Sequence, residues 1–255
     1  MVKLGGSLLD QDGPPDALLR ALATAWGAGR RLVILHGGGQ HIDRALAARG
    51  IRRRVHDGLR ITDAATLEVV VSVLAGLVNK SLVARLIAAG VKAVGLCGAD
   101  GGTLMAEFHP RDNGIDYGFV GRIATVDPYP IQALLDARML PVVASVALGP
   151  RGKLLNVNAD AAAAALAVAL GAQRLVFCTD VEGLLDGNRN LVARIDPQGA
   201  RSLMACGAVN GGMRPKLNAC IEAVSRGVPD VLIAGPSSYQ AVLREGMGGT
   251  CVVAG

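Results

Sequence analysis

Short apolar runs rich in β-branched residues or leucine recur along this chain and alternate with longer amphipathic segments. This alternation predicts a parallel sheet, because parallel strands need long crossover connections that are usually helical. The expected strands include residues 31–35, 92–96, 140–144, 174–178 and 230–233. We therefore expect an α/β fold in which helices cover both faces of a mostly parallel sheet.

Two segments carry clear helical patterns. Residues 16–26 place Leu18, Leu22 and Trp26 four positions apart, on one face of a helix. Residues 64–88 have enough apolar positions for a long, largely buried helix. Both segments are expected to pack against the sheet.

The composition changes between residues 108 and 123, where Pro, Asp, Asn, Tyr and Gly gather. A plain surface loop and a hairpin-like excursion both fit this composition, and we favour the excursion. The Gly149–Pro150 pair then follows an apolar run and predicts the end of a strand. It also gives a soft boundary within a single domain of residues 1–255, between an N-terminal lobe of about 1–150 and a C-terminal lobe of about 151–255.

The net charge of +5 comes from scattered basic residues, and the densest basic run, Arg52–Arg54, is typical of a solvated surface turn. Only 3% of the residues are aromatic, so the stacking platform of a single-strand nucleic-acid binder is not expected. The composition therefore favours an anionic small molecule as the partner and not nucleic acid.

The N-terminus has no signal-peptide pattern, and we find no apolar stretch that approaches the length of a membrane span. The five cysteines are far apart and form no CxxC pair, so we expect reduced core thiols and no metal ligands. A cytoplasmic protein without a membrane partner or a protein-held metal is expected.

Glycine-rich turns with nearby lysines stand at both ends of the chain. Lys3 precedes Gly5 and Gly6, three glycines at 37–39 follow an expected strand, and Lys216 follows a glycine pair at an expected helix start. Backbone N–H groups at such turns bind anions, and lysine adds positive charge. The alternative for each turn is a plain glycine turn without chemistry. The G-x-x-x-x-G-K-[ST] and G-x-G-x-x-G fingerprints are absent, which argues against ordinary P-loop and Rossmann proteins.

Polar residues precede two of the expected helices. Arg60 follows Gly58 and comes just before a helix that Thr62 or Asp63 would cap. Its guanidinium suits a carboxylate, held by two parallel hydrogen bonds, although a surface arginine is the alternative. The run 156–160 reads NVNAD, where Asn158 or Asp160 would cap the alanine-rich helix that follows. Capping explains only one of its three polar residues.

Six motifs together resemble the amino-acid kinase family, and within it the acetylglutamate kinases. They are KLGGSLLD (3–10), LHGGG (35–39), DGLRITD (57–63), NVNAD (156–160), TDVEGLLD (179–186) and GGMRPK (211–216). The resemblance spans nearly the whole chain. It implies a three-layer αβα sandwich like that of carbamate kinase, with the N-terminal lobe binding an amino-acid substrate and the C-terminal lobe binding MgATP.

The same resemblance implies roles for individual residues. Lys3 and Lys216 would stabilise the transferring phosphoryl group, and Asp160 would orient both lysines. The substrate would be bound by Gly38, Gly39, Arg60 and Asn156, with Arg60 on its α-carboxylate. ATP would contact Gly5, Gly6, Asp180, Val181, Glu182, Gly183, Leu184, Leu185, Ala208, Val209 and Asn210. No role follows for Ser7, Gln40 or His41.

The activity implied is ATP-dependent phosphorylation of the side-chain carboxylate of N-acetyl-L-glutamate, which gives N-acetyl-L-glutamyl 5-phosphate in the second step of arginine biosynthesis. A carboxylate with a pKa of about 4.3 is ionised near neutrality, so the reaction needs no general base. It needs neutralisation of negative charge, by lysines, by glycine N–H groups and by Mg²⁺ held mainly by the ATP phosphates.

Other activities remain open at this point. The acid could be aspartate, glutamate or an aminoadipate derivative, whereas a uridylate kinase is disfavoured because Arg60 has no uracil-reading context. A non-catalytic amino-acid or nucleotide sensor of the same fold is disfavoured by the presence of both lysines and Asp160. The chain starts almost at its first strand, and by resemblance we therefore expect a homodimer that arginine does not inhibit.

Overall fold

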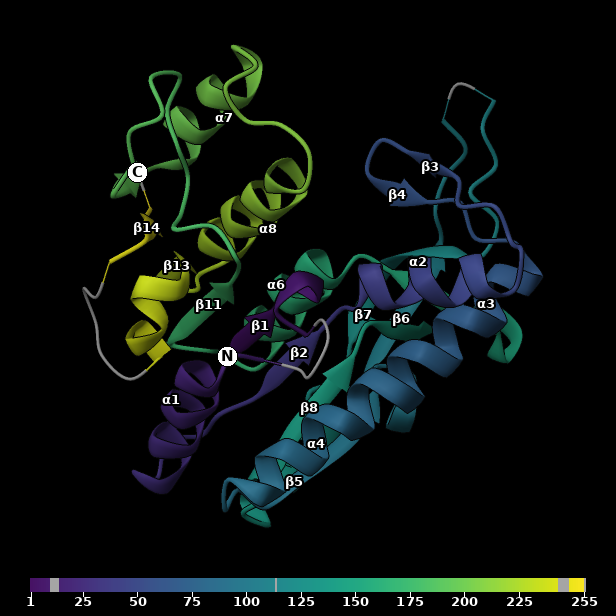
Figure 1. Ribbon diagram of the computed structural model, residues 1–255, viewed down its shortest axis with the longest axis horizontal. Coiled ribbons are helices and arrows are strands. Elements are labelled where there is room, and N and C mark those ends of the chain that lie inside the picture. The colour runs from purple at the N-terminus through teal and green to yellow at the C-terminus, as the bar shows by residue number, and fades with distance from the viewer. Residues whose placement is uncertain (10–13, 113, 243–247, 255) are drawn as a thin grey trace.

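The structure is a computed structural model that describes residues 1–9, 14–112, 114–242 and 248–254. Its centre is an eight-stranded sheet in the order β12-β14-β13-β11-β1-β2-β8-β5, where only the β13–β14 pair is antiparallel (Figure 1). The strands are β1 (Val2–Leu4), β2 (Ile34–His36), β5 (Ala93–Cys97), β8 (Leu140–Ala144), β11 (Arg174–Cys178), β12 (Arg194–Ile195), β13 (Asp230–Ala234) and β14 (Thr250–Val252).

All five expected strands are present. The strand predicted at 31–35 is found at 34–36, because its partner β1 begins at Val2, directly opposite Ile34. Strands β1 and β2 thus lie at the centre of the sheet, and the turns that follow them face the same edge.

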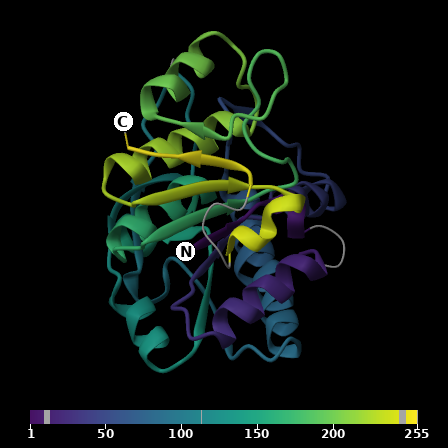
Figure 2. The ribbon, with the colours of Figure 1, turned by 90° about the vertical axis from the view of Figure 1, so that its left-hand side faces the viewer.

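Helices cover both faces of the sheet, as Figure 2 shows from the side. They are α1 (Asp16–Gly27), α2 (Gly39–Ala48), α3 (Ala64–Val71), α4 (Asn79–Ala88), α5 (Tyr129–Asp136), α6 (Ala159–Ala169), α7 (Pro197–Ala205) and α8 (Met213–Ser225).

Two hydrophobic cores lie on the two faces of the sheet. Along β11, Leu175 and Phe177 point into one core, whereas Val176 and Cys178 point into the other, because successive side chains of a strand alternate. Helices α1 to α4 pack on the face of the sheet that carries Val176, and helices α5 to α8 pack on the face that carries Phe177. The predicted three-layer αβα sandwich is therefore confirmed.

The segment predicted as one long helix, 64–88, is helical throughout, because a π-helical stretch, η2 (Ser72–Val78), joins α3 to α4. Two expectations about it are wrong. It is 25 residues long with a mean hydropathy of 1.7 in its most apolar window, so by length and composition it could cross a membrane. Only 39% of that window is buried, so the helix is not largely buried. It lies on β5 and β8 with one side, while Leu77 and Ile87 face outward, 64% and 55% exposed.

A second, four-stranded sheet was not expected. It closes in the order β10-β7-β6-β9 and consists of β6 (Leu104–Phe108), β7 (Val120–Val126), β9 (Val146–Leu148) and β10 (Leu154–Val157). Strands β6 and β7 are antiparallel, which confirms a hairpin-like excursion between residues 108 and 123. The Gly149–Pro150 pair does end a strand, but the turn leads from β9 directly back into β10 of the same sheet. The division into two lobes stays a prediction.

A short hairpin stands beside the small sheet, formed by β3 (Val55–His56) and β4 (Leu59–Arg60). Its turn residues, Asp57 and Gly58, have φ angles of 46° and 76°, as a two-residue hairpin turn of type I′ requires. In Figure 1 the hairpin projects next to α2 and α3. It carries Arg60 to the edge of the sheet where the glycine turns lie.

Candidate active site

Several of the predicted site residues lie at the carboxyl ends of the central parallel strands. The glycine turns follow β1 and β2, and the run from Asp180 follows β11, so all three leave the sheet at one edge. Helices α6 and α8, which carry Asp160 and Lys216, pack against each other. Ligands bind at this edge in open α/β sheets.

Lys3, Asp160 and Lys216 form one buried charge cluster. Lys3 Nζ lies 2.7 Å from Asp160 Oδ1, and Lys216 Nζ lies 3.3 Å from the same oxygen. None of the three residues is more than 7% exposed. Two ammonium groups thus face a single carboxylate, and the excess positive charge suits a phosphoryl group in a water-poor setting.

The pKa values in this cluster follow from burial and pairing. Burial lowers the pKa of Lys3, and the carboxylate of Asp160 opposes that effect while Lys216 adds to it. Burial alone would raise the pKa of Asp160, but the two ammonium groups outweigh it and hold that pKa below the ordinary value. Burial raises the pKa of the neighbouring Cys178 thiol to about 12, so this cysteine stays protonated and is no nucleophile.

The glycine turns approach each other too closely for larger residues. A Cβ on Gly6 would lie 2.9 Å from the backbone nitrogen of Gly39, and a Cβ on Gly38 would lie 2.8 Å from Cδ2 of Leu74. The N–H groups of Gly38 and Gly39 donate to no acceptor within the described part of the chain. Unpaired N–H groups at the start of α2 are suited to an anion.

All four residues predicted to bind the substrate line one cavity of about 180 Å³: Gly38, Gly39, Arg60 and Asn156. Arg60 is fixed on its two sides. Its Nη1 forms an ion pair with Asp43 Oδ1 at 2.5 Å, without the angles of a hydrogen bond, and its Nη2 donates to the Gly39 carbonyl at 3.2 Å. Sequence reasoning missed Asp43, because nothing in the helix pattern shows that the β3–β4 hairpin brings Arg60 against it.

Asn156 reaches the same hairpin through Thr62. Asn156 Nδ2 donates to Thr62 Oγ1 at 3.1 Å, and this hydroxyl donates to the Arg60 carbonyl at 2.7 Å. Thr62 was expected only as a possible helix cap, but Asp63 caps α3 and Thr62 is fully buried under the site. Asn158 caps α6, which leaves Asp160 for the lysines.

The residues predicted to bind ATP form two separate segments and one turn. Gly5 donates its N–H to the Cys178 carbonyl, which ties the first glycine turn to β11. After β11, Glu182 bonds to Ser237, and Leu184 is buried with its N–H donating to Thr250 Oγ1. The segment 208–210 stands directly before the glycine pair and α8. Their joint role toward a nucleotide stays a prediction.

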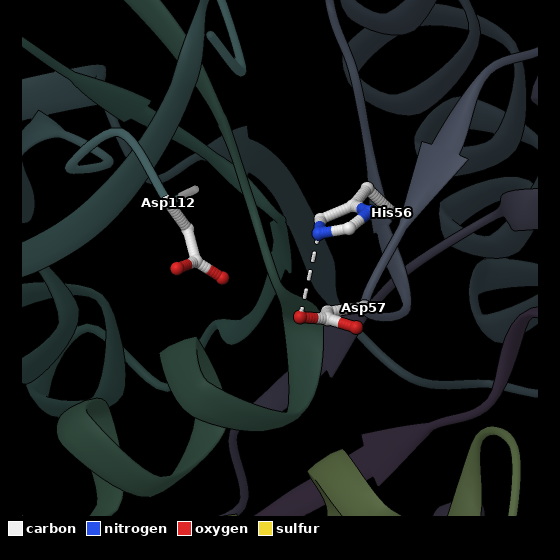
Figure 3. A group of neighbouring side chains, drawn as sticks. All are labelled: His56, Asp57 and Asp112. Carbon is white, nitrogen blue, oxygen red and sulfur yellow. Dashed lines mark ion pairs between the residues drawn. The ribbon is translucent and has the colours of Figure 1, made fainter. Parts of the chain in front are cut away.

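One further group of metal-ligating side chains occurs among the described residues. His56, Asp57 and Asp112 have ligand atoms within 4.8 Å of one another, where the β3–β4 turn faces the excursion between β6 and β7 (Figure 3). Asp57 and Asp112 are exposed. Exposed acidic groups of this kind are common on protein surfaces, and the cluster alone does not establish a metal site.

Comparisons with known proteins show the family of this chain. A model of the amino acid kinase family matches residues 1–235. The acetylglutamate kinase of Brucella anthropi is 41% identical, with 96% of this chain and 86% of that protein covered. The chloroplastic acetylglutamate kinase of Arabidopsis thaliana is 40% identical, with 96% and 71% covered. The structure of smu.665 from Streptococcus mutans UA159 superposes with a TM-score of 0.87 at 29% identity, covering 100% and 98% of the two chains. This chain therefore belongs to the amino acid kinase family, together with the acetylglutamate kinases.

Proposed function

We propose that this protein transfers the γ-phosphoryl group of ATP to the side-chain carboxylate of N-acetyl-L-glutamate and so forms N-acetyl-L-glutamyl 5-phosphate, the second step of arginine biosynthesis. The observation that carries the proposal is the buried Lys3–Asp160–Lys216 cluster beside the glycine turns. The activity of the acetylglutamate kinases that resemble this chain supports the choice of acid.

The catalytic residues act through charge and position. The acceptor carboxylate is ionised near neutral pH, so it attacks without a general base. Lys3 and Lys216 neutralise the charge that develops on the transferring group, and Asp160 holds both ammonium groups in place. The N–H groups of Gly38 and Gly39 at the start of α2 add further donors for this group.

Mg²⁺ enters this reaction with the nucleotide, as MgATP. The carboxylate of Asp160 is committed to two lysines, which leaves the ATP phosphates as the main ligands of the cation. The nucleotide itself would lie along residues 180–185 and 208–210 of the C-terminal lobe, next to Gly5 and Gly6.

The acid would occupy the cavity beside Arg60. A guanidinium binds a carboxylate best through two parallel hydrogen bonds, and the ion pair with Asp43 holds this guanidinium at the cavity wall. Arg60 would take the α-carboxylate of the substrate, while Asn156 lies across the cavity and is oriented by Thr62.

Trapping of the product tests reaction type and substrate together. Hydroxylamine converts an acyl phosphate to a hydroxamate, so incubation with MgATP and a panel of acids should give hydroxamate with N-acetyl-L-glutamate and little with aspartate, glutamate or aminoadipate derivatives. Strong signal with another acid would replace the substrate and keep the reaction. ATP binding without hydroxamate from any acid would instead favour a non-catalytic sensor.

We further infer a homodimer in the cytoplasm with small-molecule substrates only. The outward side of the helix 64–88 exposes Leu77 and Ile87, and β5 beside it is the last strand of the central sheet. Exposed apolar side chains next to an open sheet edge suit a second copy of the same surface. Nucleic acid and membranes are not among the proposed partners.

A further inference from the structure

His36 is a buried histidine between the glycine turn and the helix 64–88, and phosphoryl transfer as described above does not use it. It is the last residue of β2 and is fully buried, as is Asn79 at the start of α4. The ring Nδ1 lies 3.0 Å from the carbonyl oxygen of Gly37, and the ring Nε2 lies 3.0 Å from Asn79 Nδ2.

The surroundings of Asn79 decide which ring nitrogen of His36 carries the proton. Asn79 Nδ2 also donates to the carbonyls of Val142, at 2.9 Å, and Leu96, at 3.3 Å, while its Oδ1 accepts from Lys80 Nζ at 3.2 Å. Carbonyl oxygens only accept and an ammonium only donates, so both ends of the amide are assigned. The amide nitrogen of Asn79 shares two hydrogens among three acceptors and cannot itself accept, so His36 Nε2 carries no hydrogen. Nδ1 therefore carries the proton, which it donates to the Gly37 carbonyl.

The side chains of Asn79 and Lys80 fit into the space above a glycine of β5. A Cβ on Gly95 would lie 2.0 Å from Asn79 Oδ1 and 2.9 Å from Lys80 Nζ, so only glycine on β5 admits both side chains. Burial lowers the pKa of His36 to about 4, which keeps the ring neutral around physiological pH. The neutral imidazole of His36, on β2, is thus held in one tautomer by Asn79 of α4, and Asn79 is itself held by carbonyl groups of β5 and β8.

The hydrogen bond to Gly37 sets the direction of the next peptide group. In a trans peptide the C=O of one residue and the N–H of the following residue point to opposite sides. Because the Gly37 carbonyl points toward the His36 ring, the Gly38 N–H points to the opposite side of the peptide group, away from that ring. The Gly38 nitrogen lies beside the first glycine turn, because a Cβ on Gly6 would lie 3.4 Å from it.

A glycine turn without this bond would not hold one orientation, because glycine peptides rotate with little steric resistance. We propose that His36 is a positioning residue for phosphoryl transfer: fixed by Asn79, it holds the Gly37–Gly38 peptide so that the Gly38 N–H faces the transferring group. This inference rests on the proposed function only for the identity of the group that the N–H meets.

Two isosteric variants separate positioning from packing. In His36→Asn the side-chain amide nitrogen takes the place of Nδ1 and keeps a donor for the Gly37 carbonyl. In His36→Gln the side-chain amide oxygen takes the place of Nε2 and accepts from Asn79, so that no donor is left for the Gly37 carbonyl. We expect kcat to fall by less than about 5-fold in the first variant and by about 100-fold in the second, the size of effect seen when one oxyanion donor is lost. The KM values for ATP and the acid should change little in either.

The control is Val143→Ala, which removes two methyl groups from a fully buried side chain of the neighbouring strand β8; this side chain makes no hydrogen bond in the network. It should lower the Tm at least as much as the histidine variants and leave kcat unchanged. Equal kcat values in the Asn and Gln variants would overturn the proposal, as would kcat losses that follow Tm across all three proteins.

Two measurements judge the proposal without turnover. The ¹⁵N spectrum of the wild-type imidazole should show His36 protonated on Nδ1 at pH 7, and a crystal structure of His36→Gln should show the Gly37–Gly38 peptide rotated. An Nε2–H tautomer, or an unrotated peptide, would refute the positioning role even if the enzyme is active. Failure of the wild type to phosphorylate any acid would refute the proposed function. The ¹⁵N spectrum and the crystal structure would then still decide whether His36 holds the Gly37–Gly38 peptide.

Discussion

At the scale of single residues, Asp160 balances two buried positive charges. Asp160→Asn leaves Lys3 and Lys216 side by side without a counter-charge, and breaking a buried pair in this way costs about 3–5 kcal/mol. Lys3→Ala should cost less stability, because Asp160 keeps Lys216 as its partner. Urea unfolding of both variants measures the difference, and a Lys3 variant less stable than the Asp160 variant would contradict this account.

The two lysines should matter to turnover far more than to the fold. We expect Lys3→Ala and Lys216→Ala each to lower kcat by at least about 10²-fold, because each removes a charge from the transferring group in a buried site. The native circular dichroism spectrum should persist in both. Near-normal kcat in the two variants would disprove the catalytic assignment.

Arg60 should act on the acid and not on the nucleotide. Arg60→Lys keeps the charge but loses the planar fork, so we expect the KM for the acid to rise by about 10-fold or more while the KM for ATP stays within error. Asp43→Asn, which weakens the hold on the same guanidinium, should raise the same KM by less. A change confined to the KM for ATP would place Arg60 elsewhere.

The neutral His36 also predicts how stability depends on pH. Its folded pKa of about 4 lies below the usual value near 6.5, with Lys3 and His41 as the charged or titratable neighbours that lower it further. Between these pH values the unfolded chain binds a proton that the folded protein does not. The free energy of unfolding should therefore fall by up to about 1.4 kcal/mol per pH unit as pH drops from about 6.5 toward 4. Denaturant titrations of wild type and His36→Asn should differ by this slope, and parallel curves would contradict the assignment.

At the scale of elements, two glycines test how tightly the helix 64–88 packs on the sheet. Gly95 faces the helix from β5, whereas Gly76 lies within the helix and serves as the control. A Cβ on Gly95 meets Asn79 at 2.0 Å, whereas a Cβ on Gly76, within the helix 64–88, has nothing within 4 Å. We expect Gly95→Ala to cost about 1–3 kcal/mol by overpacking, and Gly76→Ala to be neutral or to stabilise by up to about 1 kcal/mol. Chemical denaturation measures both, and equal effects would mean that β5 can move away from the helix.

At the scale of the whole molecule, the proposed dimer would form through the exposed side of the helix 64–88. Leu77→Asp places a charge on the proposed interface and should turn a dimer into a monomer in sedimentation velocity runs. Tyr129→Asp, at a residue 71% exposed on the opposite face of the sheet, is the control and should leave the dimer intact. A dimer that survives Leu77→Asp would place the interface elsewhere.

The order of elements and the location of the glycine turns follow from the sequence alone. The apolar runs have the composition of strands whichever neighbours they later pair with. The cap residues Asp63 and Asn158 act within the first turn of their own helices. The family resemblance rests on motifs of the same local kind. For these features, neighbouring residues in the chain supply the physical cause.

Only the tertiary structure decided which distant groups meet. No pattern in the sequence shows that Asp43 pairs with Arg60, that Thr62 supports Asn156, or that the four short strands of the small sheet close on one another. The same holds for the helix 64–88, which is long and mostly apolar although less than half of its most apolar stretch is buried. Strand pairing, ion pairs and burial depend on side chains brought together across the fold, and local sequence fixes the partners available but not the contacts they make.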